Sequence, residues 1–179
     1  MDFDAIFEDV FPPLFRYCHR LTGDADAAED VTQEAFVRLL TRDVEGPPAG
    51  LRVWLFRVAT HLIRDRYRVS ENRRRLLEKH PVLPSGTPDP GVEMERSETT
   101  ASVRAALATL QERDREMLLM REEGFSYREI AEAVGVKAAS VGTLLARAQK
   151  RFTEAFRSLE TGEAPPEGVP GREDHEPLG

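Results

Sequence analysis

The sequence predicts an all-α protein of two small helical domains joined by a flexible linker. Apolar residues recur at intervals of three and four along most of the chain, as they do on the buried face of an amphipathic helix. Prolines and glycines separate these stretches, and the densest cluster, residues 80–97, has no apolar period. We therefore expect a domain over residues 1–79, a linker over 80–97, a second domain over 98–160 and a disordered acidic tail over 161–179.

The first periodic stretch ends at Gly23, a residue that favours the end of a helix. Pro12 and Pro13 lie inside it, and because proline lacks a backbone N–H we expect a kink there or a helix start at Pro12. Asp24 or Asp26 can cap the helix that follows.

The second predicted helix covers about residues 27–41 and has an acidic polar face. Its apolar positions point inwards, whereas the polar positions that point outwards are Glu29, Asp30, Gln33 and Glu34. An exposed acidic face is most often only a solvated surface. The loop that follows is marked by glycine and proline over residues 46–50.

The third predicted helix runs over residues 51–68 and on towards residue 79, and it contains most of the positive charge. Residues 52–79 have nine cations and three carboxylates, a net charge of +6 in a chain whose net charge is −7. Arginines with aromatic residues between them suit single-stranded nucleic acid, because bases stack on rings while cations follow the backbone. The alternative places Trp54 and Phe56 in the core and the arginines in water, and for Trp54 it is at least as well supported. The outward arginines are Arg57, Arg64, Arg66 and Arg68, interleaved with Trp54, Phe56, His61 and Tyr67.

Residues 124–151 have the pattern helix, glycine turn, helix. Ser126 and Glu129 have the spacing of a capping box. Gly135 lies where the chain must turn, and a second helix begins near Ala138 to Ser140. This is the helix-turn-helix pattern, whose second helix can enter the major groove of DNA. The alternative is a helical hairpin that only packs.

Composition narrows the function classes. Cys18 is the only cysteine and the four histidines are scattered, so we expect no disulfide, no metal site and no cofactor. We expect Cys18 to lie in the core. No group of residues has the spacing of a nucleophile with its base or of a phosphate loop, so we expect no enzymatic activity. No apolar run approaches the roughly 18 residues of a membrane span, and the acidic N-terminus does not resemble a signal peptide. We therefore expect a cytoplasmic protein without membrane insertion.

Three blocks of the sequence together resemble the extracytoplasmic-function sigma factors of bacterial RNA polymerase. Residues 26–36, DAAEDVTQEAF, resemble the polymerase-binding segment of that family. Residues 54–59, WLFRVA, followed by Asp65 and Arg66, resemble the segment that melts and recognises the −10 element. Residues 107–152 resemble the domain that recognises the −35 element. The resemblance covers about residues 3–157, both domains in the family's order.

The resemblance implies a role for each surface. Asp30, Gln33 and Glu34 match positions that bind the clamp helices of the polymerase β′ subunit, and the C-terminal domain would touch the β flap. An anti-sigma factor is a further implied partner, beside core polymerase and promoter DNA. The residues implied for the −10 element are Trp54, His61, Arg64, Asp65, Arg66 and Arg68. Those expected for the −35 element are Lys137, Ser140, Thr143, Arg147 and Lys150.

The sequence departs from the family at two places. His61 stands where asparagine is usual. Gly142, Leu144 and Ala146 fall where the second helix of the helix-turn-helix usually has cations. Fewer phosphate contacts imply a weaker and less salt-sensitive grip on DNA. Glycine inside a helix also costs about 1 kcal/mol relative to alanine.

The implied function is that of a sigma factor, which binds core polymerase, recognises the −35 element and opens the −10 element. The alternative is a sigma-like mimic that sequesters an anti-sigma factor without initiating transcription. The basic third helix argues against the mimic, and the cation-poor helix of the helix-turn-helix argues for it. The 18 linker residues reach about 60 Å when extended, so the two domains could bind separate DNA sites. Because the linker is rich in proline, we expect two domains with little shared surface.

Overall fold

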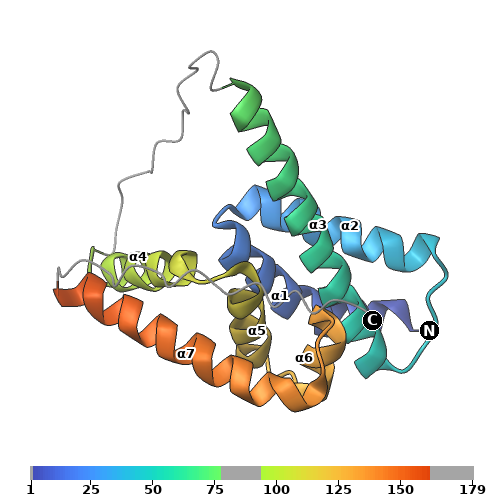
Figure 1. Cartoon of the computed structure of the whole chain (residues 1–179). Helices are drawn as coiled ribbons and strands as arrows, with labels where there is room; N and C mark the ends of the chain where they lie inside the picture. The colour runs from blue at the N-terminus through green and yellow to red at the C-terminus, as the bar shows by residue number, and fades with distance from the viewer. Residues whose placement is uncertain (1, 78–93, 162–179) are drawn as a thin grey trace, which may run out of the picture.

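The computed structural model describes residues 2–77 and 94–161, with side chains described for residues 2–69 and 100–161. The regular secondary structure of these residues is entirely helical (Figure 1), which confirms the predicted fold class. The helices are α1 (Phe3–Thr22), α2 (Ala25–Thr41), α3 (Pro48–Leu77), α4 (Met94–Thr109), α5 (Glu112–Glu122), α6 (Tyr127–Val134) and α7 (Ala138–Thr161).

Helices α1, α2 and α3 pack on one another and form the N-terminal unit. The turn between α1 and α2 has the predicted signals. Gly23 ends α1 with a left-handed φ of 71°, and the Asp24 side chain accepts hydrogen bonds from the backbone N–H groups of Asp26 and Ala27. The C-terminal turns of α3 extend past the other helices of this unit (Figure 1).

Helix α1 continues through Pro12 and Pro13, so the alternative start at Pro12 is wrong, whereas the expected kink stays a prediction. Proline at position 12 leaves the carbonyl of Glu8 without its usual partner within the helix. Glu8 and Pro12 are both exposed, so water can satisfy that carbonyl. The opposite face buries Val10 and Leu14, and this burial stabilises the helix on both sides of the prolines.

Helices α4 to α7 form the C-terminal unit, in which α4 lies along α7, and α5 and α6 pack beside them (Figure 1). Helix α4 begins at Met94 and so takes in the last four residues of the segment expected to be linker. The rest of that segment, residues 80–93, lies outside the described residues, as does the expected tail beyond Thr161.

The two units share a hydrophobic core, so the expectation of little shared surface is wrong. Helix α6 packs on α3, and α5 packs on α1. Phe56 of α3 and Phe125, just before α6, are both fully buried, and their ring centroids lie 4.5 Å apart. Aromatic pairs at this separation stabilise an interface beyond the area they bury.

Cys18 lies in this core, as the sequence predicted. Burial raises the pKa of the Cys18 thiol to about 12, so the thiol stays protonated at neutral pH. A buried thiol that does not ionise is a packing residue and not a nucleophile.

Candidate nucleic-acid interface

Asp30, Gln33 and Glu34 form a polar ridge along one side of α2. Their spacing of three and four residues puts them on one helix face, opposite the buried Val31 and Leu39. Asp30 and Gln33 are exposed, and 44% of the Glu34 side chain is accessible. The ridge is therefore available to a partner.

The ridge is held within its own helix and continues as an apolar strip. The Glu34 carboxylate accepts a hydrogen bond of 2.7 Å from Arg38 Nε, and Gln33 Nε2 donates to Glu29 at 3.0 Å. Val37 and Leu40 follow on the same side and are both about half exposed. Large apolar side chains left in water next to a polar ridge are typical of a protein-binding surface.

The predicted −10 residues of α3 point to three sides of the helix. Trp54, His61, Asp65 and Arg68 recur at helical spacing on one stripe. His61, Asp65 and Arg68 are exposed, whereas Trp54 is half-buried against the core. Trp54 thus combines the two interpretations that the sequence left open, because it packs on the core and also reaches the surface.

Arg66 points to the other side of α3, towards α2. Its guanidinium lies 3.5 Å from the Asp30 carboxylate, and both side chains are about half or more exposed. A pair so exposed contributes about 0–1 kcal/mol. It nevertheless brings the polar ridge of α2 next to the basic helix α3.

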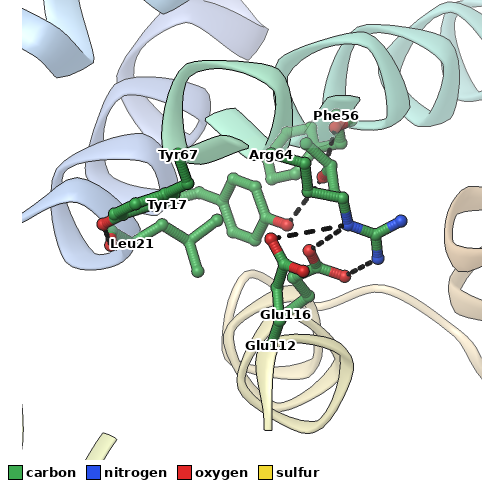
Figure 2. Close-up of polar contacts among 8 residues, drawn as sticks. Tyr17, Leu21, Phe56, Arg64, Tyr67, Glu112 and Glu116 are labelled. Carbon is green, nitrogen blue, oxygen red and sulfur yellow. Dashed lines mark hydrogen bonds and ion pairs between the residues drawn. The ribbon is translucent and has the colours of Figure 1, made fainter. Parts of the chain in front are cut away.

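Arg64 faces neither side of that pattern but the C-terminal unit (Figure 2). Its Nε atom donates to Glu116 Oε1 of α5 at 2.8 Å, and its Nη2 atom bonds the other carboxylate oxygen. Glu112 lies at 3.8 Å from the same guanidinium. The hydrogen bonds that Arg64 donates to Glu116 raise the pKa of Arg64, which keeps the guanidinium charged.

The Arg64–Glu116 pair lies beside the buried Tyr17 hydroxyl (Figure 2), which shares a hydrogen bond of 2.8 Å with Thr60. Burial raises the pKa of Tyr17 well above its usual range, so this hydroxyl is neutral. Burial also raises the pKa of the Glu116 carboxyl, and the hydrogen bonds from Arg64 oppose that shift. The charge of Glu116 therefore depends on Arg64.

The helix-turn-helix consists of α6, a turn at Gly135 and α7. Both halves of the Ser126–Glu129 capping box are present, and Gly135 has a left-handed φ of 74°, as predicted. The buried face of α7 includes Val141, Leu145 and Ala148. The predicted −35 residues are all exposed: Lys137, Ser140, Thr143, Arg147 and Lys150.

Of the two cations near the C-terminal end of the helix-turn-helix, Lys150 and Arg151, only Lys150 is free to bind a DNA phosphate. Lys150 lies 3.8 Å from the Glu154 carboxylate, with 77% of its side chain exposed, so this contact is weak. Arg151 donates to Asp114 Oδ2 at 2.8 Å and thereby ties α7 to α5. Asp114 is 5% exposed at its side chain, so this pair has a structural role.

Arg57 is not among the residues predicted for the −10 element, although it lies on the same stripe of α3 as His61 and is partly exposed. Helical periodicity alone could have added it. The arginines and carboxylates that join the two units were also missed, and no local pattern marks them.

Two classes of site find no support in the part of the chain that the structure describes. No group of three or more histidine, cysteine or carboxylate side chains is placed to hold a metal ion there. None of the described helices combines the length and apolar character of a membrane span.

Comparison with known families matches both units. Residues 6–74 match Sigma-70 region 2, and residues 100–152 match Sigma-70, region 4. A solved structure of the sigma factor RpoE from Bartonella quintana, in complex with the anti-sigma factor NepR, is similar in fold, with a TM-score of 0.63 and 22% identity. That similarity covers 87% of this chain and 97% of the other.

Two curated relatives extend the comparison. The ECF RNA polymerase sigma factor SigE of Mycolicibacterium smegmatis is 31% identical over 156 residues, which cover 84% of this chain and 61% of SigE. The chain thus spans less than two thirds of that relative. The ECF RNA polymerase sigma factor SigL of Mycobacterium tuberculosis is 32% identical over 160 residues, which cover 87% of this chain and 89% of SigL. The chain therefore belongs to the ECF sigma factors.

Proposed function

We propose that this chain binds core RNA polymerase and directs promoter-specific initiation of transcription. The observation that carries the proposal is the presence, in order, of Sigma-70 regions 2 and 4, each with its polar face exposed on a helix. The function is one of binding and not of bond chemistry, and its place of action is the cytoplasm, with the polymerase.

The polar ridge Asp30, Gln33 and Glu34 is proposed to bind the clamp helices of the β′ subunit. Carboxylates and an amide on an exposed helix face suit a partner with basic side chains. Val37 and Leu40 extend the same face and would add apolar contact. This surface lies away from the helix-turn-helix, so polymerase and −35 DNA would not compete for it.

The stripe on α3 is proposed to hold the −10 element once its strands separate. Trp54 and His61 offer rings on which a base can stack, and Arg68 offers a cation for the backbone. Arg66 and Asp65 flank this stripe. Arg64 would join it only when its bond to Glu116 is broken.

Helix α7 is proposed to enter the major groove of the −35 element. Ser140 and Thr143 would contact bases, and Lys137, Arg147 and Lys150 would contact phosphates. All five are exposed, and Ser140, Thr143, Arg147 and Lys150 lie on one face of the helix. The C-terminal unit would also contact the β flap of the polymerase.

The alternative function, a mimic that sequesters an anti-sigma factor, is favoured by the cation-poor surface of α7. Ala146 and Leu144 stand on that helix where a DNA-binding surface usually has cations. The two functions differ in one result, because a mimic would bind an anti-sigma factor but would not support transcription with core polymerase.

The proposal is tested by Asp30→Arg combined with Glu34→Arg. Reversing two charges on the α2 ridge should abolish co-elution with core polymerase and run-off transcription, while the far-ultraviolet circular dichroism stays unchanged. The matched control is Asp4→Arg with Glu8→Arg, which makes the same charge change at the same spacing on exposed positions of α1.

Unchanged affinity of the α2 variant for core polymerase would contradict the docking surface. If the wild-type chain binds core polymerase but gives no transcript from any genomic fragment, the mimic is the better description.

A further inference from the structure

A cavity of about 680 Å³ lies where α4, α5 and α7 of the C-terminal unit meet the C-terminal end of α1. None of the described residues that line it is among those proposed to contact DNA or polymerase. Cavities of roughly 300–1,000 Å³ have the size of small-molecule sites. The proposed function therefore leaves this cavity without a role.

One part of the cavity lining is apolar, and three helices supply it. Two of these side chains belong to the buried core, and the other three are partly buried against it. An apolar ligand chain that contacts them leaves water, which favours binding in proportion to the area removed. The five apolar side chains are Val103 and Leu107 of α4, Leu118 and Leu119 of α5, and Phe152 of α7.

The rest of the lining is mainly cationic. Arg20, Arg104 and Arg121 line the cavity together with a single carboxylate, that of Glu122. Three arginines and one carboxylate give a net charge of +2, counting His19 as neutral, in a chain whose net charge is −7. The local field therefore attracts an anion.

Arg104 is the cation with the fewest other contacts. It is exposed on α4 and forms no ion pair with any described residue. Its aliphatic stem lies beside Gly23, at the end of α1 that also has His19 and Arg20 in its last turn. Arg104 and Arg20 thus reach the cavity from the two units.

Arg20 is also available, whereas Arg121 is already engaged. Arg20 lies 3.9 Å from the Glu123 carboxylate, but Arg16 already binds that carboxylate at 2.8 and 3.3 Å. Arg121 donates to the Phe125 carbonyl at 2.9 Å. Two guanidinium groups consequently remain for an anionic group in the cavity.

We propose that this cavity binds a small amphipathic carboxylate. Its apolar chain contacts the side chains of α4, α5 and α7, and its carboxylate lies between Arg104 and Arg20. A guanidinium binds a carboxylate through two parallel N–H bonds. A single negative charge fits better than the two charges of a phosphate monoester, because Glu122 repels the second. The inference is independent of the proposed function, since the cavity has none of its residues.

The test measures binding of three probes to the full-length chain by isothermal titration calorimetry, each below its micelle concentration. Decanoate has both the chain and the charge, 1-decanol has only the chain, and acetate has only the charge. One decanoate should bind per chain, 1-decanol should bind more weakly, and acetate should give no measurable heat. Octanoate should bind about tenfold more weakly than decanoate, because two fewer methylenes are buried.

Arg104→Gln tests the position of the carboxylate. It should weaken decanoate binding about tenfold, because a charge-assisted hydrogen bond is lost, and should leave 1-decanol binding unchanged. Arg113→Gln is the matched control, because Arg113 is exposed, belongs to the same unit and does not line the cavity. It should change neither affinity. Arg20→Gln is a second variant in case Arg104→Gln does not fold, and it should give the same selective loss.

Three results would overturn the proposal. Equal affinity of the wild-type chain for decanoate and 1-decanol would show that no cation takes part. Equal losses of both probes in Arg104→Gln, or equal effects of Arg104→Gln and Arg113→Gln on decanoate, would show that Arg104 does not hold the carboxylate. Failure of decanoate to bind would leave an acidic peptide as the occupant that this lining favours.

Discussion

Gly142 and Gly135 both belong to the helix-turn-helix, but only Gly135 is required by the backbone. Gly135 has a φ of 74°, a conformation that costs an ordinary L-residue roughly 1–2 kcal/mol. Gly142 lies inside α7 without a positive φ, and a Cβ there would meet the Tyr127 ring at 3.4 Å, an ordinary contact. The sequence alone offers no reason for glycine at position 142, and the structure offers only this contact.

Gly142→Ala is therefore expected to stabilise the protein by about 0.5–1 kcal/mol, because alanine loses less backbone entropy in a helix. For a protein of this size, each kcal/mol of stabilisation raises the Tm by about 2–4 °C. Thermal unfolding measures this shift. Gly135→Ala is the matched control and should lower the Tm. A lower Tm for Gly142→Ala would show that the Tyr127 ring cannot accept the methyl group.

At the scale of one element, α6 depends on its first turn. Glu129 accepts hydrogen bonds from the Ser126 hydroxyl at 2.6 Å and from the Ser126 backbone N–H at 2.7 Å. Both hydrogen bonds lower the pKa of Glu129, and the bond from the Ser126 hydroxyl has the larger effect. A group whose pKa is lower in the folded state contributes stability above its unfolded pKa, and this contribution is lost as the pH falls through the folded value.

Glu129→Gln keeps the geometry of the capping box but removes the charge. We expect its Tm to lie below that of the wild-type chain at pH 6.5, and the difference to shrink as the pH falls below the ordinary pKa of glutamate, about 4.3, and Glu129 becomes protonated. Calorimetry across this range is the measurement. Glu132→Gln, at an exposed position of the same helix, should show no such convergence.

At the scale of the whole molecule, the shared core should make unfolding cooperative. Phe125 is fully buried between the units, so Phe125→Ala should lower the free energy of unfolding by about 3–5 kcal/mol. The wild-type chain should unfold in a single transition by both near- and far-ultraviolet circular dichroism. Phe156→Ala, towards the far end of α7, should cost less. Two separate transitions in the wild-type chain would contradict a shared core.

The charged residues are distributed unevenly over the whole molecule. The chain is acidic, yet nine of its 25 lysines and arginines fall in residues 52–79. The C-terminal unit places two buried carboxylates on cations of the N-terminal unit. The net charge of −7 therefore says little about nucleic-acid binding, because binding depends on the local field.

Local signals in the sequence determined most of the helix boundaries. The turn at Gly23 and Asp24, the capping box at Ser126 and the turn at Gly135 each depend on residues within one turn of one another, so the sequence predicts them correctly. The exposed faces of α2 and α7 follow from periodicity for the same reason. The prolines of α1 are the exception, because burial of the opposite face overrides local propensity.

The joining of the two units was decided only by the tertiary structure. Arg64 and Glu116 are 52 residues apart, and Arg16 and Glu123 are 107 apart. The spacing of residues along a helix indicates which side of it each side chain occupies, but not which distant helix it will meet. Arg64 has the same local pattern as Arg68, yet Arg68 is exposed and Arg64 pairs with a buried carboxylate. That difference arises because Glu112 and Glu116 of α5 lie beside Arg64, whereas Arg68 faces water.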